Sequence, residues 1–411
     1  MSRGSGYELF RQRQFRTLWT ANLALNLGLV MMLLGAAWAM TSMTTNALLV
    51  SMVQTVMSLP FLFFGIPVGI ASDAWGHRSL LFAAQVWMLA VTAVLAFIAW
   101  RWNLTPWLLL SMLFLIGTGV VVQQSAWKPF LHDLVPEDKL VAAISFNALS
   151  NKIAQAVGPI IGGYLMGVAG TAIVLLARAV SHVIMIVALR FMPNGGAAES
   201  GGSRTAGGVT LSLREGWDFL KRSPQLYGPM IRCAVLMGPC AGVLALLPLE
   251  AKENIQTGVI GYGGLLAALG AGTTSGVSLM PLLQRHFRLN TMSVVALAVF
   301  SLAVLGISRW DSMLLDATFL LFFGFAWSIL SVSHQFAVQV CSPEHMRGLM
   351  TSFYALVLQG AMAAGSFGFG LIAQHAGVSR SILIAGFVAM GGLVLVRRYP
   401  MPEDAPAQAA A

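Results

Sequence analysis

Residues 47–72 read ALLVSMVQTVMSLPFLFFGIPVGIAS, and this stretch contains no charged side chain. A helix of about 20 apolar residues crosses the ~30 Å hydrocarbon core of a bilayer. The stretch shows no alternating polar pattern, and lipid offers no partners for open backbone groups, so it predicts a membrane-spanning helix. Directly after it, DAWGHR (73–78) ends the apolar run with one carboxylate and a basic turn.

The composition of the whole chain indicates that most of its surface faces lipid. Of its 411 residues, 57% are hydrophobic and 9% are charged. A water-facing surface usually carries about a quarter charged residues. The first apolar run is full length and lacks a small-residue cleavage site, which predicts a retained helix and not a signal peptide. Twelve spanning helices are expected, near 17–38, 47–71, 79–100, 106–126, 141–166, 171–189, 229–249, 257–281, 289–308, 312–333, 347–373 and 378–396.

The positions of the charges predict how the chain lies in the membrane. Of the 24 Lys and Arg, three fall within spans and four fall in loops on one side, namely Arg101, Lys252, Arg309 and Arg380. The remaining seventeen collect on the other side, which the positive-inside rule assigns to the cytoplasm. Both termini are therefore expected to be cytoplasmic. The net charge of +9 reflects this topology, and no nucleic-acid partner is expected.

A glycine-rich segment, MPNGGAAESGGSRTAGG (192–208), separates the spans into two sets of six. Its composition is typical of a flexible linker. Ser212 and Glu215 then form a capping box, which predicts a short amphipathic helix before Pro224. The expected domains are an N-terminal six-helix bundle at 1–191, a cytoplasmic linker with this helix at 192–224, a C-terminal six-helix bundle at 225–400 and a disordered tail at 401–411.

The two sets of spans contain an internal repeat. Sliding the chain by 207 residues aligns Gly163 with Gly370 and Gly170 with Gly377, within an unbroken alignment of about sixty residues. Six helices separate the copies, so both halves have the same orientation in the membrane. Parallel repeats of this kind build many transporters with a site between the halves.

The residues around DAWGHR carry charges that need partners. Asp73 ends the second span and Arg78 begins the third, and at both places the helix dipole disfavours that sign of charge. Gly69 lets another helix approach closely, and Gly76 permits the tight turn. A topogenic loop without further function is the alternative interpretation.

Gly69, Asp73, Gly76 and Arg78 match the signature G-x-x-x-D-R-x-G-R-R, so the chain resembles the major facilitator superfamily. The resemblance implies an all-α membrane protein with 12 transmembrane helices in two pseudo-symmetric six-helix bundles. It also implies that Asp73 caps the start of the eleventh helix and latches the outward-open state, with Arg347 as its partner. Ala74 and His77 stand where the family usually has basic residues, and His77 is either a pH-sensitive element or a solvated histidine.

A second motif, GPIIGG (158–163), resembles the antiporter motif of exporters in this superfamily. Its bending and packing residues are Gly158, Pro159, Gly162 and Gly163. FRTLW (15–19), LVPEDKL (134–140), LREGWDFL (213–220) and MRG (346–348) add a resemblance to the branch that contains the enterobactin exporter and macrolide efflux pumps. This likeness implies export across a bacterial inner membrane by a multi-pass monomer.

Polar side chains deep in the spans are candidates for cargo binding, because they are costly in lipid. Lys152 lies mid-span with no carboxylate at its depth, and the alternative is that it bonds carbonyls between helices. Its repeat mate is Gln359, and the family architecture implies that both border a central cavity. The Asn22 and Asn26 pair either binds cargo or bonds another helix. The substrate-binding candidates are Lys152, Gln359, Asn22, Asn26, Asn151 and Gln155.

Other buried ionisable residues are candidates for proton coupling. Asp316 lies inside the outer end of its span, with an interfacial cap as the alternative, and Arg178 and His182 form a spacing-four pair. Arg232 and His334 lie near inner helix ends and are expected to snorkel to the interface.

These residues favour a transporter over other classes. The mid-membrane side chains are basic, and a low-dielectric cavity of that sign attracts anions. No nucleophile elbow, zinc-protease motif or Walker loop occurs, so no enzyme, cofactor or metal is expected. Energy is then expected from the proton gradient. The sequence predicts proton-driven export of an anionic amphiphile such as a siderophore, and broad drug (macrolide-type) efflux is the alternative.

Overall fold

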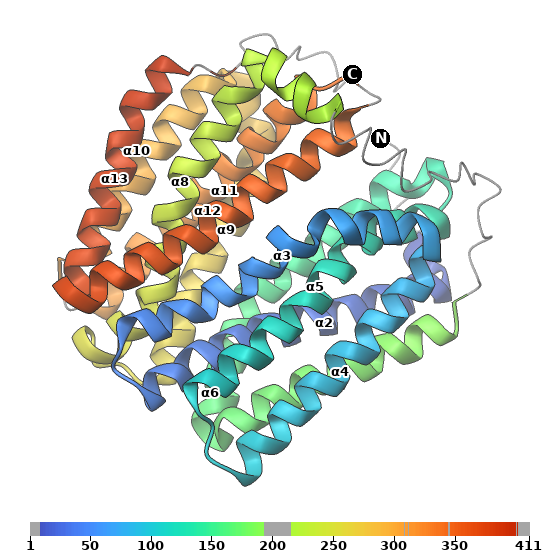
Figure 1. The fold of residues 1–411 in the computed structure, drawn as a ribbon, viewed down its shortest axis with the longest axis horizontal. Helices are drawn as coiled ribbons and strands as arrows, with labels where there is room; N and C mark the ends of the chain where they lie inside the picture. The colour runs from blue at the N-terminus through green and yellow to red at the C-terminus, as the bar shows by residue number, and fades with distance from the viewer. Residues whose placement is uncertain are drawn as a thin grey trace. The chain divides into compact units, whose positions relative to one another are not determined.

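The computed structural model describes residues 9–192, 215–307, 309–310, 312–343, 346–399 and 401, except for the side chains of 66, 70–74 and 397. These residues form helices joined by short turns, with no strand among them (Figure 1). The helices are α2 (Arg13–Met43), α3 (Ala47–Trp75), α4 (His77–Arg101), α5 (Pro106–Leu134), α6 (Glu137–Arg190), α8 (Pro224–Leu249), the π-helix η1 (Glu250–Asn254), α9 (Val259–His286), α10 (Leu289–Ile307), α11 (Met313–Val340), α12 (Arg347–Ala376) and α13 (Val378–Arg398).

Helix α6 contains two membrane spans that are joined at Gly170. Its 54 residues include Gly170, whose φ of 76° and ψ of −171° are not helical, so the chain turns there. Eleven helices in the described residues are long and apolar enough to cross a membrane, and α6 contains two of the predicted spans. The predicted fold, an all-α membrane protein with twelve spans, is confirmed.

The internal repeat is visible in the backbone. Gly377 stands 207 residues after Gly170 and adopts the same left-handed conformation, with φ of 91° beside the 76° of Gly170. Each glycine separates the fifth span of its set of six from the sixth. A side chain at either position would be strained, because L-residues rarely adopt positive φ.

The described residues divide into two compact units. Unit 1 takes its members from Met1–Thr45, Leu59–Ser203 and Thr257–Ala267, and unit 2 from Asn46–Ser58, Arg204–Gln256 and Ala268–Ala411. Each unit therefore draws most of its residues from one half of the chain and a short segment from the other. Two predicted segments lie outside the described residues. They are residues 193–214 of the linker, which include the Ser212 cap, and residues 402–411 of the tail.

Unit 1 is organised around the pairing of α2 with α6, the most extensive helix pairing among the described residues, and α4 packs on α5 and α6. Its core includes Leu18 and Leu25 of α2, Leu81 of α4, Phe130 of α5 and Met185 of α6. Burial of these side chains brings the polar groups of α2 and α6 against each other.

Unit 2 is organised around α8, which packs on α12, α13 and α11, while α10 packs on α11 and α13. The tilted rings of Phe300 and Phe323 pack against each other in its core, with ring centroids 4.7 Å apart. Residues 215–222 form the predicted short helix, and Trp217 packs edge-on against Phe353 of α12.

Large apolar side chains cover the outside of the helices. Trp100 is 74% exposed and Leu314 is 77% exposed. A soluble monomer rarely exposes contiguous apolar surface of this kind, whereas lipid solvates it. The exposed faces are therefore membrane-facing, and the polar groups that remain inside the units are the candidates for function.

Candidate functional site

Lys152 lies half-buried on the first half of α6, in unit 1. It makes no hydrogen bond or ion pair within the part of the chain that the structure describes. Asn151, beside it, donates to the backbone oxygen of Asn147 at 3.3 Å, and Gln155 lies half-buried one turn further along. The ammonium of Lys152 is thus a cation within a membrane span of unit 1 that can take an anionic partner.

The asparagines of α2 bond helix α6. Asn22 Nδ2 lies 3.0 Å from Asn147 Oδ1 and 2.9 Å from Ser150 Oγ. Asn26 Nδ2 lies 2.9 Å from the same Ser150 hydroxyl. We call Asn22, Asn26, Asn147 and Ser150 the asparagine cluster. Of the two interpretations that the sequence left open for Asn22 and Asn26, the structure shows the contact between helices.

Trp127 joins the asparagine cluster from α5. Its indole Nε1 donates to Asn147 Oδ1 at 3.0 Å, so Asn147 accepts from two helices at once. Trp127 and Ser150 were not among the residues predicted from the sequence, although Ser150 lies one turn from Asn147. The cluster therefore fixes α2, α5 and α6 next to Lys152.

Gln359, the repeat mate of Lys152, lies half-buried on α12 in unit 2. Its placement near the middle of a span agrees with the sequence, and its role in cargo binding stays a prediction.

Arg178 and His182 are buried in the core of unit 1. Arg178 Nη1 donates to the backbone oxygen of Leu25 at 2.7 Å. His182 Nδ1 lies 2.6 Å from Gln85 Oε1, and Gln85 Nε2 donates to Gln123 Oε1 at 3.0 Å. Arg178 Nε and His182 Nε2 have no hydrogen-bond partner among the described residues. The glutamines of α4 and α5, which the sequence analysis missed, thus connect this pair to two further helices.

Two carboxylates are buried among the described residues of unit 2. Asp316 lies fully buried in the first turn of α11, where the helix dipole favours a negative charge. Glu250 begins the π-helix η1 and is also buried; its Oε2 accepts from Asn254 Nδ2 at 2.6 Å. Asn254 Nδ2 also lies 2.8 Å from Ser379 Oγ of α13. Glu250 was not predicted as a site residue, although an acid directly after the apolar run 229–249 is a signal that the sequence contains.

The structure describes Gly69, Gly76, Arg78 and Arg347 of the predicted latch, but not the side chain of Asp73. Gly76 precedes α4 with φ of 79°, the turn that the sequence predicted. Arg78 Nε donates to the backbone oxygen of Leu189 at 3.1 Å, so it finds its partner at the carboxyl end of α6. Arg347 begins α12 and its Nε donates to the Gln339 oxygen at 3.2 Å. The Asp73 side chain, and with it the predicted contact to Arg347, lies outside the described residues.

Gly69 of the same signature has open space around it, since no atom lies within 4 Å of where its Cβ would be. The close helix approach expected at Gly69 is not found among the described residues.

The glycines of GPIIGG pack α6 against two helices. A Cβ at Gly158 would lie 3.1 Å from Val30 Cγ1, and one at Gly162 would lie 3.1 Å from Met31 Cα. A Cβ at Gly163 would lie 2.9 Å from the backbone oxygen of Val259 in α9. Pro159 is buried between them. The motif therefore serves close helix packing, which fits the interpretation drawn from the sequence.

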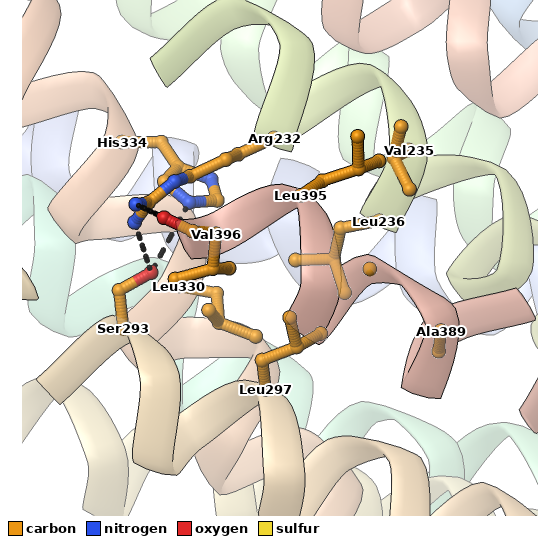
Figure 2. Close-up of a pocket in the computed structure, with 11 residues that line it drawn as sticks. Arg232, Val235, Leu236, Ser293, Leu297, Leu330, His334, Ala389, Leu395 and Val396 are labelled. Atoms are coloured by element: carbon orange, nitrogen blue, oxygen red, sulfur yellow. Dashed lines mark hydrogen bonds between the residues drawn. The ribbon is translucent and has the colours of Figure 1, made fainter. Parts of the chain in front are cut away.

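Arg232 and His334 are buried in unit 2 and do not snorkel, so that expectation was wrong. Arg232 Nε donates to Tyr399 O at 2.8 Å, and its Nη2 to Val396 O at 2.8 Å. Figure 2 shows the guanidinium beside His334 and Ser293, and Ser293 Oγ lies 3.5 Å from His334 Nε2. Backbone carbonyls of the last turn of α13 and of the residue directly after it therefore accept hydrogen bonds from this cation.

The space beside Arg232 is too small for cargo. Its volume is about 10 Å³, which is the size of one water molecule at most. No group of three His, Cys, Asp or Glu side chains suited to a metal ion occurs in the described ranges. The residues around Arg232 therefore stabilise unit 2 and do not form a ligand site.

Comparisons with known proteins agree with this architecture. The family model described as transmembrane secretion effector matches residues 4–411. The chain is 22% identical over 385 residues to macrolide efflux protein A of Streptococcus pyogenes, covering 91% of this chain and 92% of that one. It is 23% identical over 371 residues to the multidrug efflux pump Tap of Mycobacterium bovis, covering 86% and 87%.

Two solved structures show the same fold. One is a bacterial homologue of the human lysosomal transporter Spinster, with a TM-score of 0.75 and 10% identity over 95% of this chain and 97% of that one. The other is a D-xylose–proton symporter, with a TM-score of 0.75 and 13% identity over 95% and 98%. The family match over nearly the whole chain, with this fold and these helix-packing motifs, shows that the protein belongs to the transmembrane secretion effector family of the major facilitator superfamily.

Proposed function

We propose that this transporter exports an anionic amphiphilic small molecule, such as a siderophore, across a bacterial inner membrane. The observation that carries the proposal is Lys152, a half-buried cation in the middle of a span with no described hydrogen bond or ion pair. A mid-membrane cation costs several kcal/mol unless a partner compensates it. A carboxylate or catecholate of the cargo would supply that compensation.

The charge balance around Lys152 supports an anionic cargo. In the spans of unit 1 the acidic or basic side chains that the structure describes inside the bundle are Lys152, Arg178 and His182. The carboxylates of the same unit that are described, Asp133, Glu137 and Asp138, lie at helix ends and are exposed. A basic region in low dielectric attracts negative ligands. Asn151 and Gln155 would then orient the polar part of the cargo beside Lys152.

A proton gradient is the proposed source of energy. Asp316 and the newly identified Glu250 are buried carboxylates, the chemical type that carries protons in many transporters. His182 and Arg178 stay secondary candidates, because their polar atoms are directed to Gln85 and to the backbone of Leu25 inside unit 1. The protein is proposed to act as a monomer. Both termini are proposed to lie in the cytoplasm, and the distribution of Lys and Arg supports this orientation.

Broad drug efflux is the second candidate, and the relatives favour it. The names of the similar proteins from Streptococcus pyogenes and Mycobacterium bovis refer to macrolide efflux and to multidrug efflux. Both relatives are named as efflux proteins, which supports export by this chain. Identities of 22% and 23% are too low to support a particular cargo.

Two measurements on a deletion strain distinguish the candidates. Export of a native anion predicts that untargeted metabolomics finds one anionic metabolite accumulating inside the cells. Drug efflux predicts hypersensitivity to antibiotics without such accumulation. Accumulation of a cationic metabolite would contradict the proposed selectivity.

The role of Lys152 is tested by transport of the accumulated metabolite into inverted vesicles. Lys152→Met is expected to raise KM by about tenfold to a hundredfold, since a hydrogen bond to a charged group contributes about 1.5–3 kcal/mol. Lys152→Arg should retain most of the uptake because the positive charge stays. Lys128→Met is the matched control, as Lys128 is exposed near the end of α5. Normal uptake by Lys152→Met at equal protein level would reject the electrostatic proposal.

A further inference from the structure

A groove lies on the membrane-facing side of unit 2, between α9, α10 and α11. Its volume is about 130 Å³, and its lining is apolar except for Thr291. Leu283 of α9, Phe287 directly after α9, Val295 of α10 and Ile329 of α11 form its walls. Phe287 and Val295 are both more than half exposed in the complete chain, so the groove opens to the surroundings of the protein.

The groove lies within one leaflet of the bilayer. α9 ends at His286 and α10 begins at Leu289, so the turn between these two spans marks a membrane boundary. On α10 the lining runs from Thr291 to Val299. Eight residues of helix rise about 12 Å, which is close to half of the ~30 Å hydrocarbon core. The groove therefore reaches from the boundary toward the bilayer centre.

The boundary end of the groove is basic. Arg285, His286 and Arg288 surround Phe287 in the sequence, and all three side chains are exposed. The segment 281–300 contains no Asp or Glu, so the sequence here carries only positive charge. Thr291, the polar residue of the lining, is also exposed at this end. The positive charge at the interface matches the phosphate headgroup of an anionic phospholipid, and the apolar cavity matches its acyl chain.

We propose that this groove binds an anionic phospholipid of the surrounding bilayer. One acyl chain occupies the cavity between α9, α10 and α11, and the phosphate lies at Arg285 and Arg288. A zwitterionic lipid fills the groove equally well but gains less from the arginines, so selectivity comes from the headgroup. The proposal concerns the lipid boundary of unit 2 and does not depend on which cargo is exported.

Native mass spectrometry of the purified full-length protein tests the selectivity. Phosphatidylglycerol is expected to stay bound under conditions that remove phosphatidylcholine. Arg285→Ala combined with Arg288→Ala should lower phosphatidylglycerol retention about tenfold or more, as each basic residue near the surface contributes to attraction of an anionic lipid. Arg13→Ala, which removes an exposed arginine at the start of α2, is the matched control. Equal retention of the two lipids by the wild type would overturn the proposal.

The acyl-chain part has its own test. Val295→Trp fills the groove and should reduce phosphatidylglycerol binding, whereas Leu302→Trp, at a 62% exposed position further along the same helix, should not. A phosphatidylglycerol that carries a photoreactive acyl chain should label residues 283–299 of the wild type. Labelling confined to other helices would overturn the groove as the site, and this readout does not depend on the folding of any variant.

Discussion

Leu189 and Val396 lie 207 residues apart, and the backbone oxygen of each accepts a hydrogen bond from an arginine of another helix. Leu189 lies in the last turn of α6 and binds Arg78 Nε at 3.1 Å; Val396 lies in the last turn of α13 and binds Arg232 Nη2 at 2.8 Å. The last carbonyls of a helix lack intrahelical partners and attract cations. Both copies of the repeat thus satisfy the end of their sixth span in the same way.

The two arginines come from different places in the repeat. The position that corresponds to Arg78 in the second copy is Arg285, and the one that corresponds to Arg232 in the first copy is Leu25. Arg285 is exposed, and Leu25 is a core residue of unit 1. In both copies a backbone oxygen at the end of the sixth span accepts a hydrogen bond from an arginine. The arginine comes from a different position of the repeat in each copy.

Loss of Arg232 should destabilise the protein. Arg232→Met leaves the buried oxygen of Val396 and the partly buried oxygen of Tyr399 without the donor from Arg232, whereas the Asn290 amide oxygen still accepts from Met401 N. Each unsatisfied buried polar group costs about 1–3 kcal/mol, so a loss of about 2–4 kcal/mol and a clearly lower Tm in detergent are expected. Arg398→Met, on the exposed end of α13, is the control and should leave Tm unchanged. An unchanged Tm for Arg232→Met would show that water replaces the guanidinium.

The helices were predictable from the sequence because hydrocarbon allows few alternatives for an apolar run. The direction of each polar side chain around its helix was not. In a soluble helix one face is polar, but here both the lipid face and the packed face are apolar, so periodicity gives little information. Arg232 was therefore expected at the interface and is found inside, and Glu250 was overlooked because its span ends in a π-helix.

The asparagine cluster was predictable only in part. The spacing of Asn22 and Asn26 places them on one face of α2, as the sequence predicted. The packing of three helices brings Ser150 to these asparagines and Trp127 to Asn147. Contacts between residues more than 100 positions apart depend on how helices pair, and one sequence contains no direct record of that pairing.

Asn22→Ala should lower stability without altering cargo affinity. The change removes hydrogen bonds to Asn147 and Ser150. Interhelical hydrogen bonds in membranes contribute about 0.6 kcal/mol on average and up to about 1.7, so a loss of roughly 1 kcal/mol is expected. Thermal unfolding in detergent and the KM for transport in vesicles are the two measurements. A raised KM at unchanged Tm would instead assign Asn22 to cargo binding.

Gly163→Ala should disturb the packing of α6 on α9. The added methyl would lie 2.9 Å from the Val259 backbone oxygen and 3.3 Å from Gly263 Cα, and neither backbone atom can rotate away as a flexible side chain could. A loss of about 1–3 kcal/mol in stability, with reduced transport, is expected from such overpacking.

Gly368→Ala is the control for Gly163→Ala. Gly368 lies in α12, and no atom lies within 4 Å of where its Cβ would be. Alanine is the better helix former by about 0.5–1 kcal/mol, so Tm should stay equal or rise. If both alanine variants behaved alike, helix propensity and not close packing would determine the effect at Gly163.

Neutralising the buried acids of unit 2 should separate transport from proton coupling. In Glu250→Gln the amide keeps an oxygen that can accept from Asn254 Nδ2, so the contact of η1 with Ser379 can persist while the ionisable group is lost. Asp316→Asn likewise keeps a side chain of the same size in the first turn of α11 while it removes the ionisable group. If either carboxylate carries the coupled proton, the variant should lose uptake driven by a pH gradient in inverted vesicles. It should keep counterflow exchange of cargo, which needs no net proton movement. Loss of both activities would indicate a structural role, and retention of both would exclude that residue from coupling.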